Sequence, residues 1–591
     1  MSIAIKGIAG ELSDISEIDP SYKNADIFKN TDDIDLKIMA EWAQNYLINT
    51  PRKEFDYEPV FQCHPLKCPP IPKKSDVVVA CDTDARMDWE WYYMREITDN
   101  DCGTLVEEAF HNRIKRYVDK DGVVWAHAGC YNETLTDAEY KESDNVIHIW
   151  GATKILKSLC LEYQKTGDTE ALNLAIRIKN SLKKLAVWDD NGRCYFAAGM
   201  GALYADKTPV SNTWNSQPAP IIEPLVTLYK MTGEQDTLDF AKAYADGVID
   251  KIQPDGLKFN PDGSFDGHSH ATMHCMWGMC ELSLETDDDK YISFAEKAFL
   301  YLLSLGTGTG WVPAATYLDN CNETCCISDM ITISTLLGKW GKPHYFDYAE
   351  RYFRNYISNL QFIVTPEFVK YYKKLHCDKP PAEVNEGLEI LKRFQGGIVG
   401  GSGLNDYENV LLGGTCGFEM FGCCSPEGMR AIYTMWSNVA VRSSDLRGFS
   451  KGVYINFSLN ADTGLANIRS AMPDHGGVLI KAKVSDDYYI RIPHWADAHK
   501  ASVYVNEKKQ KPVTSGAYLM VAGINKDDEI TVIYPLVSFT QTVSGLWSKT
   551  AGRPDLSLTF RWVGNMVISV SPGAEHTPLF GGRARQLPAF L

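Results

Sequence analysis

The sequence predicts an α+β chain of more than one domain, in which an (α/α)6 toroid-barrel is followed by one or more β-sandwich domains. Helical hairpins follow one another over residues 31–445, and short β-branched segments take over in residues 446–591. The length agrees with a chain of more than one domain, because 591 residues with 45% hydrophobic side chains can bury more core than one domain usually holds. The prediction is therefore a helical domain followed by a β-rich one.

Residues 1–30 are predicted to form a short N-terminal segment. Residues 1–7 show no basic stretch followed by a long apolar core and a small-residue cleavage site, and no later run approaches a membrane span. We therefore expect a cytoplasmic protein without a membrane partner. The net charge is -17, whereas a nucleic-acid partner needs a basic surface, so we expect no nucleic-acid partner.

Residues 31–445 are predicted to form the barrel. Residues 155–163 and 225–231 place apolar side chains at intervals of three and four, which indicates one buried helix face. Similar breaks follow at intervals of about 54 to 66 residues, enough for a helix pair and a loop. The breaks are Thr166-Gly167-Asp168, Thr232-Gly233-Glu234, Thr286-Asp287-Asp288 and Gly341-Lys342-Pro343. An open solenoid is the alternative, but its repeats are normally shorter and more uniform.

Residues 446–591 are predicted to form the β-sandwich part. Short alternating segments rich in β-branched residues are separated by Gly, Asp and Asn, as is typical of strands. The expected strands lie at 452–457, 477–484, 488–492 and 529–534. This part carries no cluster of catalytic residue types, so its expected role is to cap and stabilise the barrel.

The cysteines point to a metal site. All sixteen lie between Cys63 and Cys424, and a long chain without a secretion signal is expected to keep most of them as reduced, buried thiols. Two motifs stand out, Asn-Glu-Thr-Cys-Cys at 322–326 and Phe-Gly-Cys-Cys-Ser-Pro at 421–426. Together they offer three soft thiolates and one carboxylate, a set that could close around a single zinc ion.

The chain resembles glycoside hydrolase family 127, the β-L-arabinofuranosidase-like proteins. The resemblance rests on Arg-Ile-Pro-His-Trp-Ala at 491–496, on the segments that follow it, and on the two cysteine motifs, which are similar to the zinc site of that family. The following segments are 503–506, 516–519 and 527–532. The resemblance extends from about residue 140 to the C-terminus. It implies a zinc-dependent retaining glycoside hydrolase that acts on a glycoside or an oligosaccharide.

The resemblance also implies roles for the motif residues. Glu323, Cys325, Cys423 and Cys424 would hold the zinc, and Cys423 would also be the nucleophile that forms a thioglycosyl intermediate. Zinc keeps thiols deprotonated at neutral pH. We expect both adjacent cysteines in a turn before a helix that Pro426 begins, where the helix N-terminus favours a thiolate. A purely structural zinc with four protein ligands is the alternative.

Sugar contacts are expected from three places. The segment 267–271 resembles a Gly-x-His-Ala segment whose histidine contacts the sugar in the family, so His270 is a predicted substrate-binding residue, with His268 beside it. Trp214 lies in a loop between hairpins and could stack on a sugar ring. Lys154 stands where the family has a histidine. Simple core packing is the alternative for the histidines and the tryptophan.

One family feature is absent. The general acid and base of the family is a glutamate that follows a glycine upstream of the zinc-binding glutamate, but the stretch 308–314 has no carboxylate. Asp319 is the nearest carboxylate and the predicted replacement, while Glu419 and Glu427 flank the second motif. Together with Lys154, this loss predicts an altered pocket that takes an acidic or otherwise modified sugar.

Two other function classes stay open. Sugar epimerases and isomerases share the toroid and transfer protons with histidine pairs and no metal, in which case His268 and His270 would be catalytic. A non-catalytic carbohydrate-binding protein is the second alternative. We also predict that the chain can form a homodimer.

Overall fold

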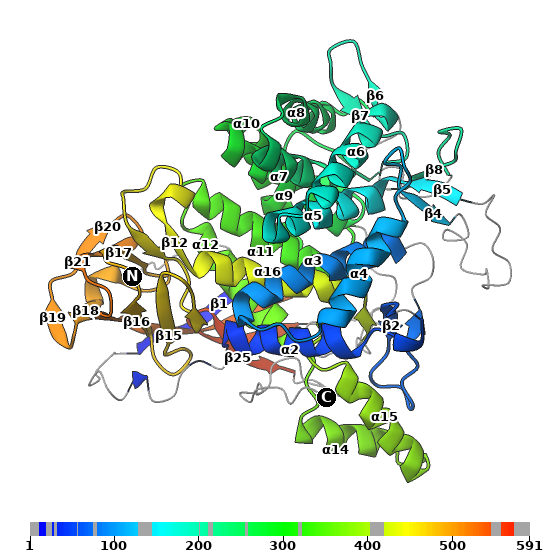
Figure 1. Ribbon diagram of the computed structural model, residues 1–591. Coiled ribbons are helices and arrows are strands. Elements are labelled where there is room, and N and C mark those ends of the chain that lie inside the picture. Colours follow the sequence, from blue (N-terminus) through cyan, green and yellow to red (C-terminus); the bar gives the residue numbers. More distant parts are fainter. Residues whose placement is uncertain are drawn as a thin grey trace.

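The computed structural model describes most of the chain, in thirteen stretches. They are residues 11–18, 27–28, 32, 34–55, 57–74, 80–127, 145–199, 201–210, 217–253, 258–316, 322–401, 419–544 and 557–572. Long helices occupy the first part and strands follow from Ala440 onward, so the predicted order of a helical part and a β-rich part is confirmed (Figure 1). Within these stretches, no helix combines the length and the apolar character that a membrane crossing requires.

Six helices form a closed inner ring. Each packs against the next along the chain, and α16 packs back against α3. The six are α3 (Ala80–Thr98), α5 (Ile149–Thr166), α7 (Ile222–Thr232), α9 (Ser269–Thr286), α11 (Thr324–Lys339) and α16 (Cys424–Val439). α11 is buried on every side along most of its length, as expected for a helix with neighbours all round.

A second layer of helices covers the ring. α2 packs on α3 and α16, α4 packs on α3, and each later outer helix packs on the inner helix before it. These helices are α2 (Leu36–Asn49), α4 (Thr104–Arg116), α6 (Thr169–Leu185), α8 (Gln235–Ile249), α10 (Asp289–Ser304) and α12 (Tyr345–Tyr352), which continues into a π-helix (Phe353–Ile357) and α13 (Ser358–Leu360). Figure 1 shows α14 (Pro366–Leu375) and α15 (Pro381–Arg393) projecting from this body.

The predicted breaks separate inner from outer helices. α5 ends at Thr166, Gly167 takes a left-handed φ of 75°, and Asp168 caps α6 by accepting a hydrogen bond from the amide of Glu170. Glycine adopts this backbone conformation without strain and aspartate is a favoured N-cap, so this short break can turn the chain. The breaks at 232–234, 286–288 and 341–343 lie between helices in the same way.

The β-rich part contains three main sheets. The predicted strands correspond to β13, β16, β17 and β22, with ends shifted by at most two residues. In spatial order the first sheet is β12 (Ala440–Arg442), β13 (Val453–Ile455), β17 (Asp486–Arg491), β21 (Tyr518–Ile524) and β20 (Val513–Ser515). The second is β14 (Ala461–Asp462), β15 (Ala466–Ser470), β16 (Gly477–Ala482), β22 (Glu529–Ile533), β18 (Ser502–Val505) and β19 (Lys508–Gln510).

The third sheet joins segments far apart in the sequence. β1 (Glu11–Ile18) pairs antiparallel with β23 (Leu536–Val543), and β24 (Leu558–Val563) and β25 (Met566–Ser571) complete the sheet. A strand within residues 1–30 therefore completes a sheet of the β-rich part. The domain boundaries at residues 30 and 445 remain a prediction.

Short elements connect the layers. Near the second cysteine motif, β11 (Met420–Phe421) pairs with β2 (Val60–Cys63), which pairs with β3 (Lys73–Lys74). Between helices lie β4 (Trp125–His127), β5 (Asn145–His148), β6 (Val187–Trp188), β7 (Cys194–Tyr195), β8 (Ala202–Leu203), β9 (Lys258–Phe259) and β10 (Phe265–Asp266). The described stretches also contain 3-10 turns at Lys53–Phe55, Ser443–Asp445 and Ala498–Lys500.

A buried charge network joins the helices to the β-rich part. Arg491, the arginine of the Arg-Ile-Pro-x-Trp segment, places its guanidinium 2.6 Å from Asp347 Oδ1 and 2.8 Å from Glu350 Oε2, both on α12. Its Nε donates to the carbonyl oxygen of Asn456, and Arg354 pairs with Glu350 from the other side. Each buried charge thus has an opposite charge within contact, which such burial requires.

Replacement of Arg491 by Ala should destabilise the protein strongly. It would leave the carboxylates of Asp347 and Glu350 buried without this cation, a loss of about 3–5 kcal/mol for a buried pair. Urea unfolding followed by circular dichroism measures the effect. Arg442→Ala is the control, because its 3.4 Å ion pair with Asp486 is half exposed and contributes about 0–1 kcal/mol. Equal unfolding midpoints for the two variants would contradict the prediction.

Candidate functional site

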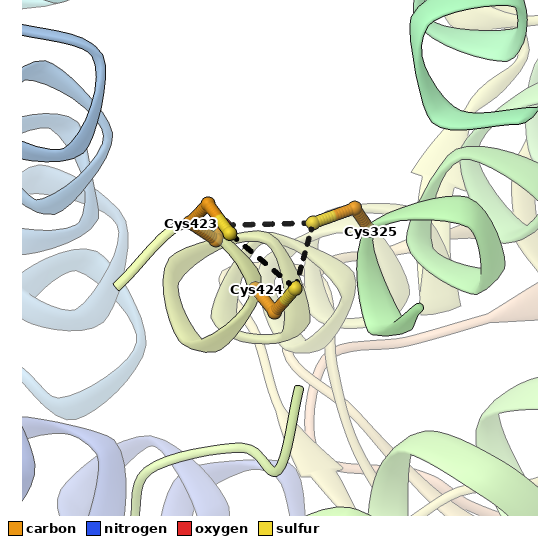
Figure 2. Close-up of side chains that lie close together, drawn as sticks. All are labelled: Cys325, Cys423 and Cys424. Carbon is orange, nitrogen blue, oxygen red and sulfur yellow. Dashed lines mark hydrogen bonds between the residues drawn. The ribbon is translucent and has the colours of Figure 1, made fainter. Parts of the chain in front are cut away.

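The three cysteines predicted as metal ligands lie together (Figure 2). The Cys325 sulfur is 3.3 Å from that of Cys424, the Cys423 sulfur is 3.6 Å from that of Cys424, and all three sulfurs lie within 4.8 Å of one another. Cys325 is on the first turn of α11, and the other two are at the start of α16. The motifs meet because α11 and α16 are neighbours in the ring.

The start of α16 differs from the prediction. Cys424 is the first residue of the helix rather than part of a preceding turn, and Cys423 is the N-cap. Pro426 is the third helical residue, a position that proline tolerates because the amides of the first turn have no partner inside the helix. The helix therefore begins two residues earlier, and the thiols still lie at its N-terminus.

A short glycine-containing segment holds the two motifs in register. The amide of Thr324 donates to the carbonyl of Gly400 at 3.0 Å, and the amide of Gly400 donates to the carbonyl of Glu419 at 2.8 Å. The hydroxyl of Ser425 donates to the carbonyl of Ile398 at 2.6 Å. These bonds attach the starts of both cysteine helices to the same stretch of backbone.

Cys423 differs from the other two cysteines. It is partly exposed, whereas Cys325 and Cys424 are each 1% exposed. Hydrogen bonds from Cys325 and Cys424, together with the nearby Arg86 guanidinium, lower the pKa of Cys423 to about 5. Burial raises the pKa of Cys325, and the pKa of Cys424 is raised by its neighbouring thiols. The thiolate charge of the cluster therefore resides on Cys423, the sulfur that solvent reaches.

Glu323, the fourth predicted ligand, faces a histidine. It is the N-cap of α11, and its Oε2 lies 2.8 Å from Nε2 of His268, the N-cap of α9. Burial opposes ionisation of both groups, but their mutual attraction lowers the pKa of Glu323 and raises that of His268. Among the described residues, the donor group within 4.8 Å contains the three cysteines and not Glu323. The structure thus brings three of the four predicted ligands together.

His270 is buried below the cysteines, with both ring nitrogens engaged. Its Nδ1 lies 2.6 Å from Oδ2 of Asp329, and its Nε2 lies 3.2 Å from a guanidinium nitrogen of Arg86. Because Arg86 can only donate, Nε2 is the acceptor and Nδ1–H donates to Asp329. His270 is 2% exposed. The histidine predicted to contact a sugar therefore already has two protein partners.

Lys154 belongs to the same buried network. Its Nζ lies 3.1 Å from Nδ1 of His274 and 4.0 Å from Oε1 of Glu427, and the side chain is 1% exposed. Burial lowers the pKa of Lys154 to about 7, and Arg86 adds to the effect. His270, His274 and Glu427 also place three donor atoms within 4.8 Å of one another. The guanidinium of Arg86 already supplies a cation to that group, and Lys154 adds a second one where it is protonated.

Glu427 remains ionised in this environment. Its Oε2 accepts from Arg430 at 2.5 Å and its Oε1 accepts from Arg86 at 3.1 Å. Although burial favours the neutral acid, these two guanidinium groups hold the pKa of Glu427 well below its usual range. A carboxylate held in this way cannot donate a proton near neutral pH. The other flanking carboxylate, Glu419, accepts a hydrogen bond from the Gln62 amide at 2.8 Å.

Four N-caps of the inner ring carry a histidine, a glutamate or a cysteine. His148, His268, Glu323 and Cys423 are the N-caps of α5, α9, α11 and α16. The free amides and the dipole at a helix N-terminus favour anionic groups. The site is therefore the N-terminal end of the inner ring.

Sequence reasoning missed Arg86. It lies on α3, which precedes the region that carries the family resemblance, and its Nη1 is 3.9 Å from the Cys325 sulfur. The i,i+4 spacing of Asp82 and Arg86 was the available signal, since such pairs face each other on a helix. Two predicted residues, Asp319 and Trp214, lie outside the described residues.

The fold is that of several glycoside hydrolases. A glycoside hydrolase family 127 β-L-arabinofuranosidase from Geobacillus stearothermophilus T6 aligns with a TM-score of 0.55 and 14% identity, over 89% of this chain and 80% of that one. A second β-arabinofuranosidase of family 127 aligns with a TM-score of 0.54 and 15% identity, over 95% of this chain and 85% of that one. A third protein, described as a glycoside hydrolase, aligns with a TM-score of 0.53 and 13% identity, over 83% of this chain and 78% of that one. No protein-family model and no curated protein matches the sequence.

Proposed function

We propose that this protein is a zinc-dependent retaining glycoside hydrolase of the β-L-arabinofuranosidase type, with Cys423 as the nucleophile. The observation that carries the proposal is the convergence of three thiols at one end of the helical ring, with Cys423 the most exposed. The likeness of the fold to family 127 enzymes supports it. The closed ring of six covered helices supports the (α/α)6 toroid, and the sheets that follow are the proposed β-sandwich.

The cysteine cluster fits zinc by spacing and by chemistry. Three sulfurs at the usual zinc–sulfur bond length in a tetrahedral site are separated by roughly 3.8 Å. The observed separations of 3.3 and 3.6 Å are close to that value. Three soft thiolate donors favour zinc over hard cations. Cys325, Cys423 and Cys424 would hold the ion, with Glu323 the proposed fourth ligand once it leaves His268.

The chain's own residues account for the covalent step. The Cys423 sulfur attacks the anomeric carbon, a carbon–sulfur bond forms as the glycosidic carbon–oxygen bond breaks, and the leaving oxygen takes a proton. Water then attacks the same carbon, gives a proton to the carboxylate that lost one in the first step, and displaces the sulfur as a thiolate, which gives net retention. When bound, zinc would keep the thiols deprotonated at neutral pH. Asp319 remains the proposed proton donor, and the ionised state of Glu427 supports a donor elsewhere.

The proposed substrate carries an acidic or otherwise modified sugar. The proposal rests on Lys154 and on the absence of a carboxylate in residues 308–314. Lys154 would bring positive charge to the region beneath the cysteines, where Trp150 lies 4.6 Å from its ammonium. Because Lys154 is engaged by His274, a carboxylate on the sugar would act on it through the network or after a local shift of this side chain.

Zinc content is the first test. The purified protein is expected to hold about one zinc ion per chain, and Cys325→Ser or Cys424→Ser should lose most of it, because each removes one of three thiolates. Elemental analysis by plasma mass spectrometry measures this. Cys326→Ala is the matched control, since Cys326 is adjacent and fully buried but outside the cluster. Full zinc content in the Cys325 and Cys424 variants would rule out this site.

Cys423→Ala should abolish hydrolysis. The expected loss in kcat is at least about 1,000-fold, because the sulfur forms the covalent bond. Release of p-nitrophenol from aryl furanosides measures it, and mass spectrometry of the wild type should find a sugar adduct on Cys423.

Activity within about tenfold of wild type in Cys423→Ala would exclude the nucleophile role. An epimerised sugar in place of hydrolysis would favour the epimerase alternative.

Lys154 should affect the choice of sugar. Lys154→Ala is expected to lower kcat/KM for an aryl uronide by about 10-fold or more, since a buried charge contact contributes roughly 1.5–3 kcal/mol, and to change a plain arabinofuranoside less. Lys157→Ala is the control, because that buried ammonium, 3.9 Å from the Trp277 ring centre, lies on the same helix. Efficient turnover of a plain β-L-arabinofuranoside that is unaffected by Lys154→Ala would contradict the acidic-sugar proposal.

A further inference from the structure

Arg86 links the cysteine cluster to the buried charges beneath it. The side chain extends from α3 and is 2% exposed. Its Nη1 lies 3.2 Å from the carbonyl oxygen of Cys423 and 3.9 Å from the Cys325 sulfur. The same nitrogen lies 3.2 Å from Nε2 of His270 and 3.1 Å from Oε1 of Glu427. One guanidinium from α3 therefore contacts residues at the start of α9, α11 and α16.

We propose that Arg86 is a positioning residue, which holds Cys325 and Cys423 in the arrangement that binds the metal and exposes the Cys423 sulfur. The inference rests on the proposed function, because it takes the cysteine cluster as the working site. It concerns a residue that neither cysteine motif contains. Arg86 is not proposed to touch the substrate.

The guanidinium is fixed before it reaches the cysteines. Its Nε donates to Oδ1 of Asp82 at 2.8 Å, one turn earlier on α3. On the other side, Nη1 donates to Oε1 of Glu427 at 3.1 Å. With both anchors in place, the contact of Nη1 with the Cys423 carbonyl sets the position of that N-cap. Nε of the planar guanidinium holds Asp82 while Nη1 reaches Cys423, whereas lysine has a single nitrogen for both places.

Charge gives a second reason for a cation at this place. A zinc ion with three thiolates and a carboxylate carries excess negative charge, and the centre of the ring is buried. Arg86 is the guanidinium closest to the sulfurs among the described residues, at 3.9 Å from Cys325. Groups that contact metal ligands in this way orient them, and their loss typically costs 10–100-fold in metal affinity or activity.

Arg430 provides a matched control. It is also a buried guanidinium at 2% exposure, and it pairs with Glu427 and with Asp329 at 2.7 Å. Arg430 also donates to the hydroxyl of Thr332, and none of these three partners is a cysteine. A purely structural role for a buried arginine should therefore affect Arg430→Lys as much as Arg86→Lys.

The experiment measures zinc affinity of full-length Arg86→Lys and Arg430→Lys by competition with a chromophoric chelator. Arg86→Lys is expected to bind zinc about 10–100-fold more weakly than wild type, with Arg430→Lys within about threefold. Circular dichroism and melting temperature report the fold. If Arg86→Lys does not fold, Asp82→Asn replaces it in the experiment. That variant weakens the contact that holds Nε of Arg86 and keeps the guanidinium itself. A wild-type affinity in the folded variant, or an equal loss in Arg430→Lys, overturns the inference.

A second readout separates this inference from the proposed function. Alkylation of Cys423 by iodoacetamide at fixed pH, mapped by mass spectrometry, reports the cluster without a metal or a substrate. The rate is expected to change on the order of tenfold in Arg86→Lys and to stay near wild type in Arg430→Lys. If the wild type neither binds zinc nor hydrolyses glycosides, the proposed function fails, and this rate alone decides the role of Arg86. An unchanged rate overturns it.

Discussion

The closure of six inner helices into one ring is the constraint on which the site depends. α11 packs between α9 and α16, and α16 packs back on α3. Short loops and outer helices return the chain, so the N-termini of neighbouring inner helices lie together. The 2.8 Å contact between His268 and Glu323 and the 3.3 Å contact between Cys325 and Cys424 both join such N-termini. Residues at these positions meet regardless of their distance in sequence.

The buried charges explain why the ring is not filled by apolar side chains. Arg86, Lys154 and Arg430 lie inside it with Glu427 and Asp329, and each carboxylate has a cationic partner. Burial of unpaired charges costs several kcal/mol per ion, whereas a complete network can be accommodated. Apolar residues of similar volume would serve stability as well. Within this network, Arg86 also contacts Cys325 and Cys423, and it is the member proposed to orient the groups above it.

Among its contacts with the helices, the β-rich part makes one buried attachment through ion pairs of Arg491. Arg491 ends β17 and is buried against the carboxylates of α12, which packs on α11. α11 carries Cys325 and Glu323 at its start. The attachment of the sheets to α12 therefore supports α11 indirectly, because α12 packs on α11, the helix that carries Cys325. This explains why the Arg-Ile-Pro-x-Trp segment is informative although it holds no catalytic residue type.

The sequence by itself determined the order of the helical and β-rich parts, the helix breaks and the cysteine motifs, because apolar periodicity, glycine, aspartate caps and thiol chemistry are local properties. It placed Cys325, Cys423 and Cys424 correctly as one group, since two motifs rich in soft donors have few other uses. The start of α16 at Cys424, the pairing of Glu323 with His268, and the burial of His270 and Lys154 were decided only by tertiary structure. The contact of Arg86 with the cysteines was also decided only when the helices packed together. These features depend on which helices become neighbours when the ring closes, and no local pattern in the chain records that.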